Sequence, residues 1–258
     1  MKVLILAGGF GSRLAEETAL IPKPMVEIGN HPIIWHIMKI YSFFGFNEFI
    51  ILLGYKGYII KEYFFNYFLH QNDVTIDLSN NSVKIHRHQC EPWIVTLIDT
   101  GQNSMTGGRI LRAAPFVNNE TFMLTYGDGV SDINIKNLVK YHKIHGKIAT
   151  MTSVQPEGRF GTIETADNGS VLKFIEKPSE SGNWINAGFF VLEPEIFSHI
   201  KNGDSSIFER EPLESLAMNN ELYTYKHRGF WKCMDTIRDK ENLQELWNSE
   251  NAPWRLWE

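Results

Sequence analysis

The chain has 258 residues, of which 43% are hydrophobic and 13% aromatic, and its formal net charge is −5. A chain of this length can bury roughly 70 to 75% of the surface that it exposes when unfolded, so we expect a single domain over residues 1–258. The acidic balance argues against nucleic-acid binding, which requires a basic face, and leaves any phosphate ligand to a few local cations.

A short apolar run, Val3–Ala7, predicts a buried strand near the start of the chain. It leads directly into the glycine-rich segment 8–13, which ends in Arg13, and Lys23 follows further along. Glycines allow positive φ angles and close approach, so successive backbone N–H groups can surround an anion. A strand, a glycine loop and two cations together indicate a nucleoside triphosphate site.

Two other phosphate-binding loops fit these glycines less well. A P-loop requires a lysine directly after its last glycine, whereas Gly11 is followed by Ser12 and Arg13. The dinucleotide fingerprint requires a small residue at position 14, where Leu14 is large. From the glycines alone, an ordinary strand-to-helix turn without a ligand stays open, and the second cation at Lys23 weighs against it.

Strand and helix patterns alternate through the first half of the chain. Further strands are expected at Phe49–Leu53, Thr121–Thr125 and Ala149–Val154, and helices at about 31–44, 57–68 and 134–145. Such alternation predicts an α/β fold with a mostly parallel sheet. Ligand sites in these sheets lie beyond the carboxyl ends of the strands, so the glycine loop and Gly127-Asp128 should share one rim.

Two stretches depart from this alternation. Between about 71 and 100, the runs Val74–Leu78 and Val83–Arg87 flank a turn at 79–82 and predict a β-hairpin insertion. The second half is rich in strand patterns, at 159–163, 171–175 and 188–192.

Several motifs together resemble those of the sugar nucleotidyltransferases, which join a nucleoside triphosphate to a sugar 1-phosphate and release pyrophosphate. In chain order the motifs are Leu6-Ala7-Gly8-Gly9-Phe10-Gly11-Ser12-Arg13-Leu14, Lys23-Pro24-Met25-Val26-Glu27-Ile28-Gly29, Gly54-Tyr55-Lys56-Gly57, Asp99-Thr100-Gly101, Met105-Thr106-Gly107-Gly108-Arg109, Tyr126-Gly127-Asp128-Gly129 and Ala252-Pro253-Trp254. The resemblance spans essentially the whole chain. It implies a Rossmann-like sheet with helices on both faces, a nucleotide-binding half over about 1–130 and a β-rich sugar-binding half over about 131–258. The longer-range likeness favours members of the family that use CTP and glucose 1-phosphate.

The resemblance implies roles for residues around the glycine loop. Arg13 is expected to hold the β and γ phosphates or the leaving pyrophosphate, and Lys23 to neutralise the α-phosphate, so both are predicted catalytic residues. Lys23 precedes Pro24, which disfavours a helix at Lys23. Arg109 is expected beside the nucleoside, although an arginine at a helix start is also a common surface residue. The predicted nucleotide-binding residues are Leu6, Ala7, Gly8, Gly9, Gly11, Ser12, Ser104, Gly108 and Arg109.

Glu176-Lys177-Pro178 resembles the family segment in which the glutamate meets sugar hydroxyls and the lysine meets the sugar's phosphate. A carboxylate suits vicinal hydroxyls, and an ammonium is a point charge suited to phosphate. A surface pair before a turn-forming proline explains Glu176 and Lys177 equally well without the resemblance. Asn186 and Gly188 are predicted to line the same pocket.

The reaction of two polyanions requires a metal ion and fixed cations in the transition state. The resemblance implies Mg²⁺ held by Asp128 and Asp235, since this ion takes one or two protein carboxylates and completes its shell with phosphates and water. Asp128 could instead be a turn residue between glycines, and Asp235 the N-cap of a helix over about 236–247. Asp132 could pair with Asp128 but equally cap a helix from residue 133, so we leave it out of the metal site.

These predictions favour an enzyme that forms CDP-glucose and pyrophosphate from CTP and glucose 1-phosphate, as a precursor for the deoxysugars of lipopolysaccharide O-antigen. Uridylyl or thymidylyl transfer to the same sugar phosphate, and a metal-dependent glycosyltransferase of similar fold, stay open as alternatives. A catalytically silent nucleotide-binding subunit is a third hypothesis, against which the full set of charged residues speaks.

Location and assembly are predicted from coarser features. Cys90 and Cys233 match no metal or disulfide spacing, no apolar run approaches the roughly 20 residues of a membrane span, and no signal-peptide pattern opens the chain. We therefore expect a cytoplasmic protein without membrane or nucleic-acid partners. The hairpin insertion and the tryptophan-rich C-terminal segment suggest a homo-oligomer, with hexamers known among similar enzymes.

Overall fold

The structure is a computed structural model that describes residues 1–86, 90–156, 162–175 and 183–257, without the side chains of residues 13, 15, 162–165, 174 and 175. The predicted sugar-phosphate residues Glu176 and Lys177 lie outside the described residues, and so does the side chain of Arg13.

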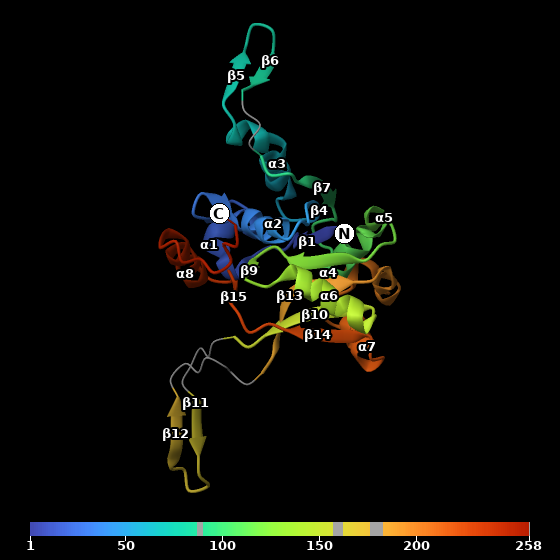
Figure 1. Ribbon diagram of the computed structural model, residues 1–258, viewed down its shortest axis with the longest axis vertical. Coiled ribbons are helices and arrows are strands. Elements are labelled where there is room, and N and C mark those ends of the chain that lie inside the picture. Colours follow the sequence, from blue (N-terminus) through green and yellow to red (C-terminus); the bar gives the residue numbers. More distant parts are fainter. Residues whose placement is uncertain (87–89, 157–161, 176–182, 258) are drawn as a thin grey trace.

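A seven-stranded sheet forms the centre of the molecule, in the order β14-β10-β13-β8-β1-β4-β7 (Figure 1). Its strands are β1 (Val3–Ala7), β4 (Glu48–Leu53), β7 (Ile94–Asp99), β8 (Phe122–Tyr126), β10 (Ala149–Val154), β13 (Ile185–Leu192) and β14 (Leu222–Lys226). β8, β1, β4 and β7 are parallel neighbours, whereas β13 runs antiparallel to β8 and β10. The predicted mostly parallel sheet is confirmed, and the four parallel strands end at one rim.

Helices cover both faces of this sheet because its strands are apolar on both sides. In β1, Val3 and Ile5 belong to one buried cluster with residues of α2, α3 and α6, while Leu4 and Leu6 belong to another with residues of α4 and α7. This follows from the alternation of side chains along a strand. The helices are α1 (Ala15–Thr18), α2 (Ile33–Phe43), α3 (Gly57–Gln71), α4 (Thr106–Arg112), α5 (Ala114–Val117), α6 (Ile135–His145), α7 (Glu211–Met218) and α8 (Ile237–Asn248).

Short two-stranded sheets decorate the body. The predicted hairpin is formed by β5 (Val74–Asp77) and β6 (Ser82–Ile85), and Figure 1 shows it projecting beyond α3. The pair β11 (Thr162–Thr165) and β12 (Val171–Ile175) projects on the opposite side. The other pairs are β2 (Glu27–Ile28) with β3 (His31–Pro32) and β9 (Gly129–Ser131) with β15 (Trp231–Cys233). Short 3₁₀-helices lie at η1 (Ser12–Leu14), η2 (Lys23–Met25), η3 (Pro194–His199) and η4 (Gly203–Ser205).

Two helix starts differ from the sequence predictions. The helix expected from residue 31 begins at Ile33, because His31 and Pro32 pair with the preceding strand. The alternative that Asp132 caps the helix α6 is wrong. Asn134 is its cap, and the Asn134 side chain accepts from the backbone N–H of Asn137. Asp132 instead contacts His227 at 2.8 Å.

The C-terminal segment is anchored to the core by aromatic side chains. Trp254 is completely buried, and its indole N–H lies 3.4 Å from Nδ1 of the equally buried His36. The C-terminal segment therefore packs against the core of the same chain. No helix among the described residues is long and apolar enough to cross a membrane.

Candidate active site

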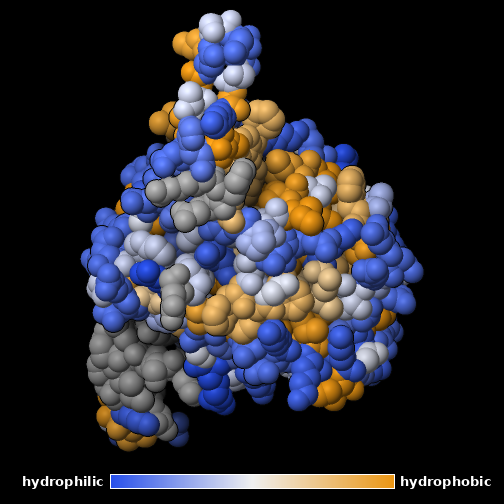
Figure 2. All heavy atoms as spheres, turned by 45° about the horizontal axis from the view of Figure 1, so that its top comes forward, coloured by the Kyte–Doolittle hydropathy of each residue, from blue (hydrophilic) through white to orange (hydrophobic). Residues whose placement is uncertain are grey.

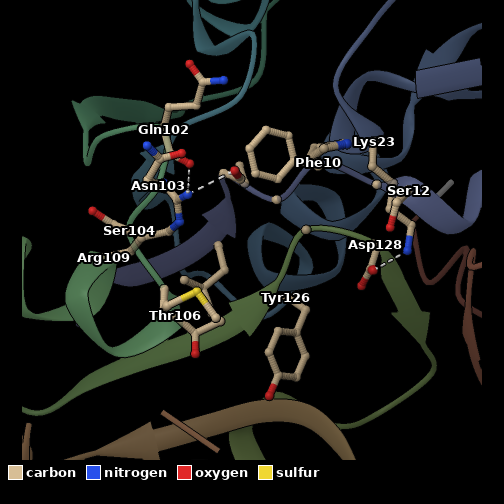
Figure 3. Close-up of a pocket in the computed structure, with 18 of the residues that line it drawn as sticks. Phe10, Ser12, Lys23, Gln102, Asn103, Ser104, Thr106, Arg109, Tyr126 and Asp128 are labelled. Carbon is tan, nitrogen blue, oxygen red and sulfur yellow. Dashed lines mark hydrogen bonds and ion pairs between the residues drawn. The ribbon is translucent and has the colours of Figure 1, made fainter. Parts of the chain in front are cut away.

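A cavity of about 550 Å³ opens at the rim where the parallel strands end (Figure 3). The glycine loop after β1, the segment after β7 and the end of β8 all contribute to it, as expected for the carboxyl ends of parallel strands. The lining residues are Leu6, Ala7, Gly8, Gly9, Phe10, Gly11, Ser12, Lys23, Pro24, Gln102, Asn103, Ser104, Met105, Thr106, Arg109, Tyr126, Gly127, Asp128 and Asp235.

The glycine loop is shaped by what surrounds it. Gly11 has a φ of +65°, and its carbonyl accepts from the N–H of Leu14 at 2.9 Å, which closes the turn. Gly8 has no room for a side chain, because a Cβ would lie 2.2 Å from Nη1 of Arg109. Gly9 has no neighbour within 4 Å of such a Cβ. At Gly8 and Gly9 the loop therefore has only backbone atoms at the cavity.

Arg109 is a buried cation that holds three strand ends together. Its Nη2 donates to Gly8 O after β1 at 3.0 Å, and its Nη1 donates to Leu53 O at the end of β4 at 3.1 Å. The same Nη1 reaches Thr100 Oγ1 and Gly101 O after β7, at 2.7 and 2.8 Å. Burial lowers the pKa of the guanidinium, which keeps its charge because its acceptors are carbonyl and hydroxyl oxygens. The alternative that Arg109 is merely a surface residue at a helix start is therefore wrong.

The segment around α4 brings Ser104 to the cavity but not Gly108. A Cβ at Gly108 would lie 2.6 Å from Cα of Asp204, so this glycine permits close packing of α4 on η4. Gly108 is not among the described residues that line the cavity, and its predicted contact with a nucleotide stays a prediction. The Oγ of Ser104 lies 2.5 Å from Thr100 O and 3.1 Å from Asp204 Oδ1, so its one proton is shared between these two acceptors.

Three charged side chains meet on the other side of the cavity, where Figure 3 shows Lys23 and Asp128 in contact. Nζ of Lys23 lies 2.6 Å from Oδ2 of Asp128 and 2.7 Å from Oδ1 of Asp235. Lys23 is the first residue of η2, so the expectation that it lies outside a helix is wrong. The following proline is tolerated because the first N–H groups of a helix need no acceptor within it.

The pairing of β9 with β15 explains why the two aspartates meet. Gly129 lies opposite Cys233, and the N–H of Met234 donates to Asp128 O at 2.9 Å. The alternative that Asp235 is a helix cap is wrong, since Thr236 caps α8 in a reciprocal capping box with Asp239. Asp235 is therefore available to Lys23.

The electrostatics of this cluster favour a charged lysine. Burial opposes the charge, but the carboxylates of Asp128 and Asp235 outweigh it and raise the pKa of Lys23. Burial together with the same two carboxylates raises the pKa of the neighbouring Cys233 thiol to about 12. Cys233 is thus a neutral thiol at pH 7 and no nucleophile.

The cluster fits a divalent metal ion. Asp128 and Asp235 direct their carboxylates at one cation, which here is the ammonium of Lys23. Carboxylate oxygens are the ligands that Mg²⁺ prefers. Within the described ranges no group of three histidine, cysteine or carboxylate side chains could hold a metal, so a bound Mg²⁺ would need further oxygens from substrate phosphates and water.

A second cavity, of about 340 Å³, adjoins the first and shares Tyr126, Asp128 and Asp235 with it. Of the predicted sugar-phosphate residues, Asn186 lines it. Gly188 has a φ of +77° and lies behind the ring of Tyr126, where a Cβ would be 2.9 Å from Cδ2. The charged cluster is therefore at the junction of two cavities.

A model of the family described as nucleotidyl transferase matches residues 2–239. The chain belongs to this family. It is 54% identical to the glucose-1-phosphate cytidylyltransferase of Salmonella typhi over 259 residues, and the similarity extends over 100% of each chain. It is also 32% identical to the mannose-1-phosphate guanylyltransferase catalytic subunit beta of Dictyostelium discoideum, over 95% of this chain and 64% of that one.

Solved structures share the fold of this nucleotidyl transferase. UDP-glucose pyrophosphorylase complexed with UDP-glucose has a TM-score of 0.69 and 17% sequence identity, over 96% of this chain and 98% of that one. The predicted Rossmann-like fold is confirmed.

Sequence reasoning missed several residues that line the two cavities. Gln102 and Asn103 directly follow the Asp99-Thr100-Gly101 motif after β7, so their place at a strand end was a usable signal. Phe10 stands inside the glycine loop, half exposed and 5.3 Å from the ring of Tyr55. Trp231, in the second cavity, had no local signal, because only the pairing of β15 with β9 brings it there.

Proposed function

We propose that this nucleotidyl transferase forms CDP-glucose from CTP and glucose 1-phosphate. An oxygen of the sugar phosphate attacks the α-phosphorus of CTP, the bond to the β-phosphate breaks, and pyrophosphate leaves in line. No general base is needed, because the attacking phosphate is already anionic at pH 7.

The observation that carries this proposal is the junction of the two cavities at Lys23, Asp128 and Asp235. The larger cavity has room for a nucleotide and the smaller one for a sugar. Since both are open to the same cluster, the α-phosphate of one ligand and the phosphate of the other would meet there. A cation at this point offsets the repulsion between two polyanions.

Roles for the charged residues follow from their positions. Lys23 would neutralise the α-phosphate as charge develops on it, and Arg13, which lies in η1 beside the cavity, would bind the β and γ phosphates. Asp128 and Asp235 would hold Mg²⁺, which when bound draws charge from the phosphates and orients them. Glu176 and Lys177 remain the predicted partners of the sugar hydroxyls and the sugar's phosphate.

The choice of cytosine rests on the 54% identity to the Salmonella enzyme. Cytosine, uracil and thymine differ by one donor or acceptor and a methyl group, which a single backbone carbonyl can distinguish. The decisive assay gives the purified protein Mg²⁺, glucose 1-phosphate and each nucleoside triphosphate in turn, and measures pyrophosphate. Release with CTP alone supports the proposal, whereas release with UTP or dTTP assigns another base.

The same assay separates this proposal from a glycosyltransferase. A glycosyltransferase would consume CDP-glucose and release CDP when an acceptor is supplied, with no pyrophosphate. It would also leave Lys23 without a triphosphate to neutralise. A requirement for Mg²⁺ is tested by adding a chelator, which should abolish pyrophosphate release, and by restoring activity with excess Mg²⁺.

We further propose a homo-oligomer built on the α3 side of the sheet. A groove of about 650 Å³ lies there beside the edge strand β7, with Phe64, Phe65, Phe68 and Trp93 in its walls. Phe65 is 80% exposed, and Figure 2 shows apolar side chains at the foot of the projecting hairpin. Light scattering should give a multiple of the chain mass of 29.8 kDa, and Phe65→Glu should lower it.

The proposed location is the cytoplasm, where CTP is made and where free thiols persist. Both Cys90 and Cys233 are free cysteines. A role in supplying precursors of surface polysaccharide is part of the same proposal.

A further inference from the structure

A single carboxylate bridges the two sides of the candidate active site. Glu209 is half-buried in the segment between η4 and α7. Its Oε2 accepts from Oγ1 of Thr106 at 2.6 Å, and its Oε1 accepts from the hydroxyl of Tyr126 at 2.8 Å. Thr106 lines the larger cavity, and Tyr126 lines both. Glu209 is not among the described residues that line either cavity, so its influence on a ligand must pass through these two side chains.

Glu209 can only accept in both of its hydrogen bonds, which fixes the direction of the bonds that follow. A carboxylate has no proton to give, so Tyr126 must donate its only proton to Oε1. The phenol oxygen can then only accept, and it accepts from Nδ2 of Asn186 at 3.0 Å. Oδ1 of Asn186 accepts from the N–H of Gly188 at 2.9 Å. The hydrogen bonds of Asn186 to Tyr126 and to Gly188 are therefore both satisfied by the same orientation of its amide.

Tyr126, in the middle of this series of hydrogen bonds, has little freedom to move. The backbone of Gly188 lies against the Tyr126 ring so closely that a Cβ would be 2.9 Å from it. Burial, followed by the Glu209 carboxylate, raises the pKa of the phenol, so Tyr126 remains a donor at pH 7. Thr106 is held as well, because its Oγ1 accepts from the N–H of Phe208 at 2.9 Å.

We propose that Glu209 is a positioning residue that presents the Asn186 amide to the sugar of the sugar phosphate. With Nδ2 bonded to Tyr126 and Oδ1 bonded to Gly188, one N–H and one lone pair of the amide are left for a ligand in the second cavity. A donor beside an acceptor matches two neighbouring hydroxyl groups of a pyranose. The inference rests on the proposed function, because it takes the second cavity as the sugar site.

The test measures KM for both substrates in Glu209→Met, which keeps the length of the side chain but removes both acceptors. We expect KM for the sugar phosphate to rise about tenfold and KM for the nucleotide to stay within about twofold, as for one lost orienting hydrogen bond. Glu209→Gln keeps one acceptor and should fall between this variant and the wild type. Glu211→Gln is the matched control, since this exposed carboxylate accepts a 2.6 Å hydrogen bond from the surface residue Asn202 and is not among the described residues that line either cavity.

A double-mutant cycle distinguishes positioning from general stabilisation. If Glu209 acts through Asn186, adding Glu209→Met to Asn186→Ala should not raise KM for the sugar phosphate further. Additive effects, or equal increases of KM for both substrates, would overturn the inference. If Glu209→Met does not fold, Tyr126→Phe breaks the same chain in the middle and must show the same selective increase. The assay uses the sugar phosphate and nucleotide that the wild-type protein accepts, so a failure of the proposed CTP and glucose 1-phosphate specificity is seen separately in the wild type.

Discussion

Lys23 and Asp128 form an ion pair of 2.6 Å at the point where two cavities meet, and Asp235 completes it from the other side of Nζ at 2.7 Å. One ammonium thus contacts two carboxylates in a partly buried place, which leaves one negative charge unbalanced. The lysine and a metal ion have the same electrostatic partners here, so binding of Mg²⁺ would free Lys23 for a phosphate.

Replacing this lysine tests its part in the reaction. Lys23→Ala should lower the rate of the chemical step by roughly 10² to 10³, the usual loss for one preorganised transition-state contact. The rate is measured in single turnovers by pyrophosphate release. Lys147→Ala is the control. Lys147 is not among the described residues that line the two cavities, and its Nζ pairs with Oε1 of Glu221 at 3.1 Å. Turnover near the wild-type value would remove Lys23 from the mechanism.

The same variant should change metal binding in the absence of nucleotide. Without the ammonium, Asp128 and Asp235 lose their neutralising partner and should bind Mg²⁺ more tightly than in the wild type. Calorimetric titration of the nucleotide-free protein with Mg²⁺ measures this change. Weaker binding by Lys23→Ala would contradict competition between lysine and metal.

Removing either carboxylate should raise the requirement for metal. Asp235→Asn is expected to increase the Mg²⁺ concentration for half-maximal activity and to lower the maximal rate by about 10² or more. Asp132→Asn is a matched control, because that aspartate contacts His227 and not the cluster. An unchanged Mg²⁺ dependence in Asp235→Asn would show that Asp235 is no metal ligand.

Two adjacent glycines should respond differently to an added methyl group. Gly8→Ala would place Cβ 2.2 Å from Nη1 of Arg109 and displace this buried guanidinium, at a cost of about 1–3 kcal/mol in the free energy of unfolding. Gly9→Ala meets no atom within 4 Å and should leave the stability nearly unchanged. Denaturant unfolding compares the two variants. Equal stability of both would contradict the close packing of Gly8 on Arg109.

The buried His36 should make stability depend on pH. Burial lowers its pKa from 6.5 to about 4, and its Nε2 contacts Ile28 O at 2.9 Å while Nδ1 accepts from Trp254. The unfolded chain takes up a proton below pH 6.5 and the folded chain only near pH 4. Stability is therefore complete above pH 6.5 and falls as the pH is lowered, by about 3 kcal/mol at pH 4 from this group.

Unfolding experiments between pH 7 and pH 4 on the wild type and on His36→Gln measure this contribution as the difference between their slopes. Carboxylates titrate in both proteins and cancel in the comparison. Parallel pH profiles would show that His36 is not responsible.

Much of the architecture was predictable because its signals are local. β1 and β10 have the predicted bounds, and for β1 the signal is a short buried run of apolar residues, which is typical of a parallel strand. The hairpin of β5 and β6 follows from alternation and turn residues. Gly108 shows the limit of this reasoning: its motif suggested a ligand, and only the structure shows that close packing on η4 also requires a glycine there.

The sequence by itself determined the α/β fold, the glycine loop after the first strand and the identity of Lys23, Asp128 and Asp235 as charged candidates, because period, spacing and residue chemistry are properties of short segments. Only the tertiary structure decided which of them meet. The pairing of β15 with β9 brings Asp235 to Lys23, and burial makes Arg109 a clamp on three strand ends. Such contacts depend on the register of segments far apart in the chain, and no local pattern encodes it.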